Sequence, residues 1–177
     1  MPRSFNVVQY GVGPIGQLCL KTLLSKPGHI NLVGAIDIDP DKVGKDVADV
    51  LGLDTPTGVI ISGDAAGVLS KTKPDVVVHT TSSFLARMYD QLILCASHGA
   101  HVVSSTEELS YPYERHPEIS KELDQVAREN GVTLLGTGVN PGYAMDALAL
   151  MATGVSNEVR SIVINREVDA GFRRLPL

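Results

Sequence analysis

A strand-length apolar run at the start of the sequence, Phe5–Tyr10, leads directly into three glycines with G-x-G-x-x-G spacing. In such a pattern the first glycine permits a tight turn, the second lets the backbone approach a pyrophosphate, and the third lets the following helix pack against the strand. The free N–H groups and the positive dipole end of that helix can then hold phosphates, and a proline suits its first turn. The spacing therefore predicts a dinucleotide-binding turn formed by Gly11, Gly13, Pro14, Ile15 and Gly16.

An acidic residue in the next strand-length run supports dinucleotide binding over a purely structural turn of small residues. Asp37 lies 21 residues after Gly16, where an acid can accept hydrogen bonds from an adenosine ribose. With Asp39 close by and no arginine following, a 2′-phosphate would meet negative charge. We therefore expect NAD(H) to be preferred, with NADP(H) possible because Lys42 or Lys45 could fold back over the site.

Apolar runs of strand length alternate with segments of helical periodicity along most of the chain. Continuous Val and Ile runs are typical of strands buried on both faces of a parallel sheet, and their alternation with helices predicts βαβ units. Gly131 is the expected stop of the last helix in this series. The predicted fold class is α/β, a Rossmann-type doubly wound parallel sheet. The expected strands cover residues 5–11, 30–39, 59–62, 74–81, 100–106 and 132–138.

The pattern changes near the end of the chain. Residues 158–171 read as a longer strand that carries Arg160, Arg166 and Glu167, which suits the first strand of a different sheet. We place the boundary near Gly154 to Asn157. The expected domains are a dinucleotide-binding domain over residues 1–155 and, over residues 156–177, the start of an α+β substrate and dimerisation domain.

Composition excludes several classes of partner. The chain of 177 residues carries a formal charge of −5 and no Lys/Arg cluster on a candidate helix, which argues against nucleic acid. Its apolar runs are much shorter than the ~20 residues of a bilayer span, and no charged-then-apolar signal opens the chain, so we expect no membrane and a cytoplasmic location. Cys19 and Cys95 lack metal-binding spacing, so we expect buried free thiols and no metal.

Polar residues follow three later strand-like runs, at the sheet edge where ligands of open α/β folds bind. Cofactor contact and helix capping are both open for these hydroxyls, and Ser83 is a fair N-cap for the next helix. Asn140 is expected to contact the nicotinamide or orient the substrate, with an Asx turn before Pro141 as the alternative. The candidate cofactor contacts are Thr80, Thr81, Ser82, Thr106 and Asn140.

The histidines have no catalytic part in this interpretation. His79 alternates with Val and Thr in its run, as a packed strand residue does. The other histidines, in turns or at helix ends, are given no role; they are His29, His98, His101 and His116.

Two adjacent glutamates, Glu107 and Glu108, lie in the stretch SSTEELSYPY, on what should be a surface turn. Solvated loop charge is the ordinary role of such residues. A catalytic carboxylate is the alternative, and periodicity cannot separate the two glutamates because adjacent residues leaving a strand point opposite ways. Partial burial beneath a nicotinamide would raise the pKa of a catalytic carboxyl toward neutrality.

The glycine turn, the segment GAIDIDPDKVGKD, the glutamates followed by Tyr-Pro, and the segment GTGVNPGYAMD together resemble the dihydrodipicolinate-reductase-like dehydrogenases. The resemblance covers essentially the whole chain and is to the branch with 2,4-diaminopentanoate dehydrogenase and the native amine dehydrogenases. The histidine-rich catalytic segment and lysine of dihydrodipicolinate reductase itself do not occur here, which argues against a lysine-biosynthesis role.

This resemblance implies an NAD(P)-dependent oxidoreductase that acts on CH–NH2 groups. Hydride would pass between the nicotinamide and the carbon of a small amine, with a ketone and ammonia on the other side of the reaction. Glu108 matches the branch's catalytic residue, with Glu107 in reserve, and Tyr111 and Tyr143 are candidates to line the pocket. The resemblance also implies a second domain, an open mixed sheet that closes over the substrate and supplies the contacts of a homodimer.

Two other functions stay open. A 2,4-diaminopentanoate-type dehydrogenase would need a carboxylate anchor such as Arg173 or Arg174. A non-catalytic NAD-binding module would keep the glycine turn and Asp37 without a substrate sheet.

Overall fold

A computed structural model describes residues 4–169 and 171 of the chain. Its centre is a six-stranded sheet in which every neighbouring pair of strands is parallel, in the order β3-β2-β1-β4-β5-β6. This order is that of the Rossmann folds, so the predicted α/β class is confirmed. The strands are β1 Phe5–Tyr10, β2 Ile30–Ile36, β3 Ile61–Ser62, β4 Val76–His79, β5 His101–Ser104 and β6 Leu134–Gly136.

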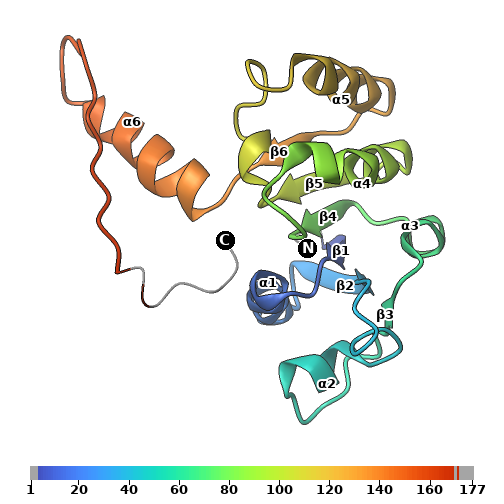
Figure 1. The fold of residues 1–177 in the computed structure, drawn as a ribbon. Coiled ribbons are helices and arrows are strands. Elements are labelled where there is room, and N and C mark those ends of the chain that lie inside the picture. The colour runs from blue at the N-terminus through green and yellow to red at the C-terminus, as the bar shows by residue number, and fades with distance from the viewer. Residues whose placement is uncertain (1–3, 170, 172–177) are drawn as a thin grey trace.

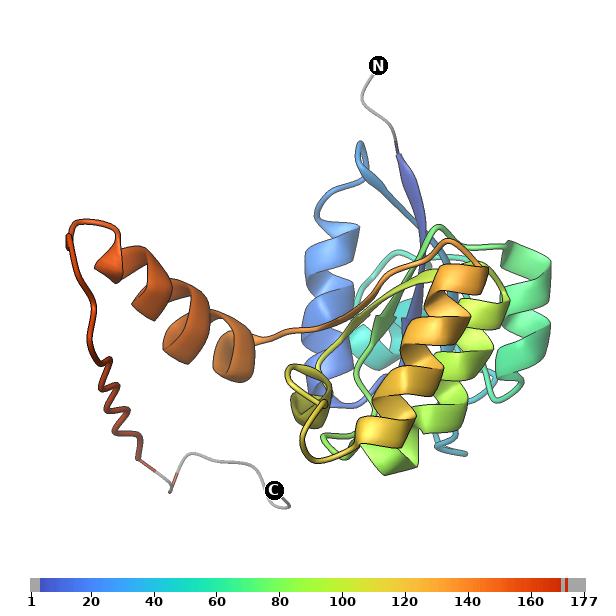
Figure 2. The ribbon, with the colours of Figure 1, turned by 90° about the horizontal axis from the view of Figure 1, so that it is seen from above.

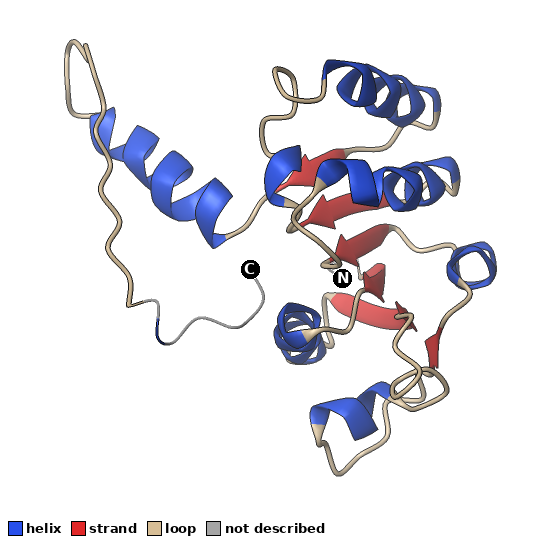
Figure 3. Ribbon diagram, in the orientation of Figure 1, coloured by secondary structure: helices blue, strands red, loops and turns tan. Residues whose placement is uncertain are grey.

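Helices cover both faces of the sheet. They are α1 Pro14–Leu24, α2 Val47–Leu51, α3 Ala65–Thr72, α4 Leu85–Ser97 and α5 Pro117–Glu129, with a short turn of helix η1 at Glu107–Leu109. Figure 1 shows α1 and α2 on one face and α3, α4 and α5 on the other, and Figure 3 shows the alternation with strands. Gly131, with φ +64°, follows the end of α5, which confirms the predicted stop signal.

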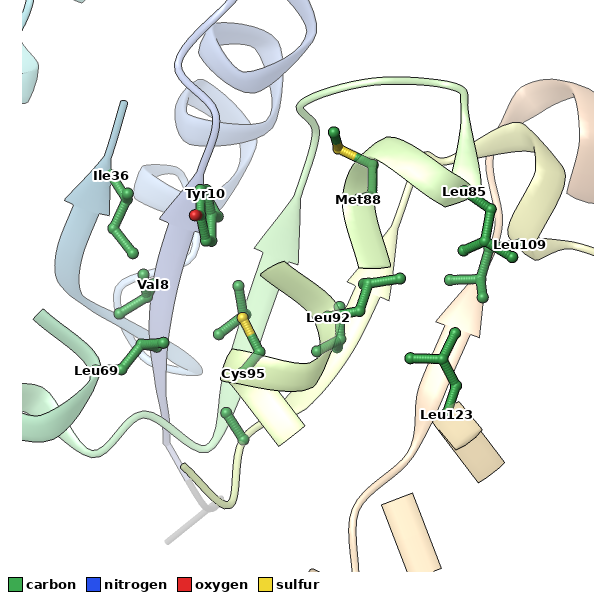
Figure 4. Close-up of a cluster of buried hydrophobic side chains, with 13 residues drawn as sticks. Val8, Tyr10, Ile36, Leu69, Leu85, Met88, Leu92, Cys95, Leu109 and Leu123 are labelled. Atoms are coloured by element: carbon green, nitrogen blue, oxygen red, sulfur yellow. The ribbon is translucent and has the colours of Figure 1, made fainter. Parts of the chain in front are cut away.

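Two apolar clusters, one on each face, hold these layers together. The larger packs α3, α4 and α5 on the sheet, with Val8, Leu69 and Leu92 fully buried (Figure 4). The smaller packs α1 and α2 on the other face and buries Leu20 and Val47 completely. Each fully buried side chain of this size stabilises the fold by about 1.5–3 kcal/mol, so the clusters fix where each strand-to-helix loop lies.

The register of the sheet brings the strand ends to one level. Tyr10 at the end of β1 pairs with Ile36 of β2 and with His79 of β4. His79 pairs in turn with Ser104 of β5, which pairs with Gly136 of β6. The residue after each of these begins a loop at the same carboxyl edge. Because α1 and α4 lie on opposite faces, the loops after β1 and β4 diverge there, as at the switch point where such folds bind ligands.

After β6 the chain leaves the sheet, as Figure 2 shows. The segment η2 Val139–Ala147, which is not helical at Asn140–Gly142, leads into α6 Leu148–Thr153, and neither has a buried residue. The expected strand over 158–171 is not formed in this structure: the described residues 158–169 pair with no other strand. A strand gains its stability from the neighbour with which it exchanges hydrogen bonds. The division into two domains stays a prediction, and Arg173 and Arg174 lie outside the described residues.

Candidate nucleotide and carboxylate site

The three glycines of the first turn have three different environments. Gly11 has φ +91°, and a Cβ there would lie 2.7 Å from the carbonyl oxygen of Thr80. A Cβ at Gly16 would lie 1.9 Å from the carbonyl oxygen of Gly11. Gly13 has no heavy atom within 4 Å of an added Cβ, and it is the N-cap of α1 with no side-chain cap. The fold itself thus requires the first and third glycines, whereas the second borders open space at the helix N-terminus.

The first residues of α1 complete this turn. Pro14 occupies the start of the helix, where its missing N–H costs nothing, and Ile15 follows it with 37% of its surface exposed. The remaining backbone N–H groups of a first helical turn have no partner within the helix. They are therefore free to meet an anion.

A buried amide supports the turn from behind. Gln9 is fully buried in β1, and its Nε2 donates to the carbonyl oxygen of Gly11 at 2.9 Å and to Thr80 Oγ1 at 2.8 Å. The Thr80 hydroxyl donates to the same Gly11 oxygen at 2.9 Å. Thr80, a candidate cofactor contact, therefore uses its hydroxyl proton to hold the turn. Gln9 was not among the predicted site residues, although a polar residue inside an apolar strand run was a visible signal.

Asp37 follows β2 and reaches across to the glycine turn. Its Oδ2 accepts the N–H of Val12 at 2.6 Å, and its Oδ1 accepts the N–H of Asp39 at 2.9 Å. Lys42 folds back toward this pair, as the sequence allowed: its Nζ is 2.8 Å from Asp39 Oδ2 and 4.0 Å from Asp37 Oδ2. The hydrogen bond from Lys42 lowers the pKa of Asp39. The carboxyl end of β2 thus holds two carboxylates and one ammonium, a mixed rather than a purely negative field.

The hydroxyls after β4 and β5 are turned mainly into the protein. Thr81 Oγ1 lies 3.0 Å from His79 Nε2 and 3.0 Å from Gln91 Oε1. Thr106 is buried and its hydroxyl donates to the carbonyl oxygen of Ser82 at 2.8 Å, tying the two loops together. The Ser82 hydroxyl oxygen accepts the N–H of Phe84 at 3.3 Å, which leaves its proton free to donate.

His79 is a packed strand residue, as predicted. It is fully buried, with Nδ1 3.0 Å from Ser104 Oγ and Nε2 2.8 Å from Gln91 Oε1. Burial lowers the pKa of its imidazole. Its edge meets the ring of Tyr10 with centroids 5.4 Å apart. The imidazole is therefore a neutral part of the core beneath the strand ends.

Glu108 differs most from the sequence expectation. Its side chain is only 12% exposed, and its Oε2 accepts the N–H of Leu85, the first residue of α4, at 2.8 Å. The same oxygen lies 3.0 Å from His116 Nε2, and Oε1 lies 2.9 Å from the Arg115 guanidinium. The bond from the Leu85 N–H, followed by the contacts with His116 and Arg115, lowers the pKa of this carboxyl. In this structure hydrogen bonds and cations outweigh burial, so the shift is opposite in direction to the rise expected beneath a nicotinamide.

Glu108 also caps the N-terminus of α4, a role expected of a serine. Ser83 was the expected cap of α4, yet the N-cap position is Phe84, with no side-chain cap of its own. The carboxylate of Glu108 supplies the acceptor instead, and its backbone N–H donates to the Ser83 carbonyl oxygen at 3.2 Å. Glu107, its neighbour, is exposed, in keeping with the solvated member of the pair.

His116 and Arg115 were not among the predicted site residues, yet both contact Glu108. They lie in the segment that leads into α5, for which His116 is the N-cap. No spacing rule links this segment to the glutamates, because the contact arises only when the chain turns back after η1. Charge close to the glutamates in the sequence was the one available signal.

Other candidates lie at the edge of this region. Asn140 is exposed in the loop after β6, and Tyr143 and Tyr111 are 58% and 67% exposed. Tyr111 stacks edge-on against Tyr113, with ring centroids 5.3 Å apart. The structure thus presents these side chains to solvent at the carboxyl edge rather than packing them into the core.

Both cysteines are free thiols in this structure. Cys95 is buried, and burial raises the pKa of its thiol to about 12, whereas Cys19 is half-buried. Residues 4–169 and 171 contain no group of three or more His, Cys, Asp or Glu side chains that could hold a metal ion. In the same residues, no helix has the length and apolarity needed to cross a membrane.

Comparison with known proteins identifies the relatives of the chain. It is 36% identical over 167 residues to 2,4-diaminopentanoate dehydrogenase of Acetoanaerobium sticklandii, a match that covers 93% of this chain and 46% of that enzyme. It is 29% identical over 147 residues to 4-hydroxy-tetrahydrodipicolinate reductase of Dehalococcoides mccartyi, covering 82% and 49%. The chain is a relative of the dihydrodipicolinate-reductase-like dehydrogenases. No protein-family model matches it.

A solved structure agrees with this relationship. The amine dehydrogenase from Mycobacterium smegmatis superimposes with a TM-score of 0.80 at 41% sequence identity, over 86% of this chain and 44% of that one. The resemblance read from the sequence is therefore confirmed. The chain spans about half the length of these relatives.

Proposed function

We propose that this chain forms the coenzyme-binding part of an NAD(P)-dependent, amine dehydrogenase-like oxidoreductase. The observation that carries the proposal is the ionised carboxylate of Glu108, held at the same sheet edge as the open glycine turn. The space before Gly13 suits a pyrophosphate, and a carboxylate of low pKa suits a cationic amine nitrogen. The names of the relatives at 36% and 41% identity support this substrate class.

The cofactor of this proposal is NAD(H), with NADP(H) as a second possibility. The backbone of Gly13–Gly16 would hold the pyrophosphate, and Asp37 would accept a ribose hydroxyl. Each oxygen of Asp37 accepts one N–H in this structure, which leaves acceptor capacity on both. Lys42 beside it could pair with a 2′-phosphate, so discrimination against NADP(H) should be moderate.

The loops after β4, β5 and β6 would hold the nicotinamide end. The hydroxyls of three candidate residues donate hydrogen bonds within the protein; these are Thr80, Thr81 and Thr106. Their proposed contribution is therefore to hold the loop backbone in position against the cofactor. Ser82 keeps a free hydroxyl proton, and Asn140 keeps an exposed amide. These two are the side chains that we propose for direct contact.

The bound nicotinamide would supply or accept hydride at C4. The residues of the site must hold the amine carbon about 3–3.5 Å from that atom and move protons at nitrogen. In the oxidation direction the carbon loses hydride to give an iminium, water adds to that carbon, and loss of ammonia leaves the ketone. Glu108 stabilises the ammonium and iminium by charge and accepts a proton from nitrogen or from the attacking water. Its low pKa makes it a strong cation partner and a weaker base.

Further parts of the proposal follow from the relatives. A diaminopentanoate-type substrate is the second candidate, favoured by the 36% identity to that dehydrogenase. The resemblance to these relatives also implies that ammonia is the nitrogen product and that a second domain forms a homodimer, and both are part of the proposal. A non-catalytic NAD-binding module would instead leave Glu108 as a helix cap alone.

The test is amine-dependent formation of NADH by the protein with a series of small amines. Glu108→Gln keeps the size of the side chain and removes its charge, so turnover should fall ~10²–10⁴-fold while NADH affinity persists. Glu107→Gln is the matched control, because that neighbour is exposed. Turnover within about threefold of the parent in both variants would refute the carboxylate mechanism. NADH binding without oxidation of any amine would favour the non-catalytic module.

A further inference from the structure

The two oxygens of Glu108 have different partners. Oε2 accepts the Leu85 N–H at 2.8 Å and lies 3.0 Å from His116 Nε2, so it is held from two sides. Among the described residues, the polar partner of Oε1 is the guanidinium of Arg115 at 2.9 Å. The carboxylate is therefore anchored through one oxygen and ion-paired through the other.

The partners of Oε2 are rigidly mounted. Leu85 opens α4, so its N–H has no acceptor within the helix and lies at the positive end of the dipole. The His116 side chain is 18% exposed, its backbone N–H donates to the Pro112 carbonyl oxygen at 2.8 Å, and its carbonyl oxygen accepts the N–H of Ser120. Both donors thus come from the N-terminal ends of packed helices, and together they fix the direction of the carboxylate.

The partner of Oε1 is held loosely by comparison. The Arg115 side chain is 72% exposed, and an ion pair of such a side chain contributes little stability because solvent screens it. Displacing the guanidinium from Oε1 therefore costs little free energy. A cationic nitrogen that reaches Oε1 would meet the same charge and the same acceptor.

We propose, on the basis of the proposed function, that His116 is a positioning residue that holds Oε2 of Glu108 in place. In the free protein, Arg115 occupies the position beside Oε1 that the amine nitrogen of the substrate takes when it binds. Oε1 is thus the oxygen that meets substrate, and Arg115 is its counter-ion in the free protein. The amine must displace Arg115, so this residue weakens amine binding without serving the chemistry.

The His116 half is tested with two substitutions that differ in one donor. The side-chain nitrogen of glutamine and the Nε2 of histidine are separated from the backbone by the same number of bonds. His116→Gln therefore keeps an N–H group that can donate to Oε2, whereas His116→Leu removes it. Leucine should lower kcat about 10- to 100-fold, as a misplaced group does, with the NAD+ KM unchanged; glutamine should restore kcat to within about threefold. Equal losses of kcat in both variants would overturn the positioning role.

The Arg115 half predicts a gain in affinity. Arg115→Ala should lower the amine KM about two- to fivefold, the range of an exposed ion pair. Arg128→Ala is the matched control, since that guanidinium is 77% exposed and pairs with Asp124 on α5. A higher amine KM in Arg115→Ala would mean that Arg115 binds substrate, and would overturn this half.

A nitrogen-15 NMR measurement separates this inference from the proposed function. The Nε2 resonance of His116 should shift in Glu108→Gln, and Arg115→Ala should tighten the binding of propylammonium followed by the same resonance. If the parent oxidises no amine but these two effects occur, the proposed function fails and the division of roles between the two oxygens stands. If neither occurs, the inference fails whatever the activity.

Discussion

Substitutions at Gly13 and Gly16 should affect different properties: cofactor binding at Gly13 and stability of the fold at Gly16. A Cβ at Gly13 meets no heavy atom within 4 Å, and a Cβ at Gly16 would lie 1.9 Å from the carbonyl oxygen of Gly11. Gly13→Ala should therefore leave the fold intact but place a methyl group where a pyrophosphate would approach the N–H groups of α1. Losing one or two charge-assisted hydrogen bonds, each worth about 1.5–3 kcal/mol, weakens NADH binding at least about tenfold.

Gly16→Ala should act through stability instead. Its methyl group overlaps backbone, so α1 must move away from β1, and overpacking of this kind costs about 1–3 kcal/mol or more. For a chain of this size that corresponds to a fall in Tm of about 3–10 °C. Gly28→Ala is the control, because a Cβ there also meets nothing within 4 Å and the residue lies in an exposed turn beyond the C-terminal end of α1, whereas the glycine turn lies at its N-terminal end.

Calorimetric titration with NADH and thermal unfolding of the three variants provide the readouts. The expected pattern is loss of affinity at unchanged Tm for Gly13→Ala, loss of Tm for Gly16→Ala, and neither for Gly28→Ala. Unchanged NADH affinity in Gly13→Ala would show that the open space before α1 is not the phosphate site. The assignment of the glycine turn would then have to be abandoned.

Three further perturbations address the carboxyl end of β2, a helix cap and a thiol. Asp37→Ala should reduce the ratio of NADH affinity to NADPH affinity about tenfold, the effect of one lost hydrogen bond to a charged group. Parallel titrations with the two cofactors measure this ratio, and an unchanged ratio would exclude Asp37 as the residue that binds the ribose. Asp46 caps α2, and the hydrogen bond from Thr57, with backbone bonds from Ala48 and others, lowers the pKa of its carboxyl to about 2. Its folded pKa is below the unfolded value of about 3.9, so the stabilisation is present above pH ~4 and lost as pH falls toward 2. The cap contributes ~1 kcal/mol to the free energy of unfolding, so the difference in Tm between the parent and Asp46→Ala should close over that pH window. Cys95, with a pKa of about 12, should resist iodoacetamide at neutral pH until the protein unfolds, as followed by mass spectrometry; alkylation of the folded protein would contradict its burial.

Features that depend on neighbours in the sequence were predictable. The parallel sheet follows from Val and Ile runs that alternate with amphipathic segments, and the glycine turn follows from the G-x-G-x-x-G spacing between a strand and a helix. The buried state of His79 followed from its alternation with Val and Thr in a strand-like run. The strand expected over residues 158–171 followed from the same logic, but composition alone cannot supply the neighbouring strand with which it would pair.

Features that depend on which loops meet at the sheet edge were decided by the tertiary structure. The sequence by itself determined the α/β class, the turn at Gly11 and the acid at Asp37, because local sterics and hydrophobic period act over a few residues. It could not determine the charge state of Glu108, since the donors to that carboxylate come from the start of α4 and the approach to α5. Burial and hydrogen bonding shift a carboxyl pKa in opposite directions. Which of them prevails depends on the positions of those donors, and only the packing of the helices on the sheet sets these positions.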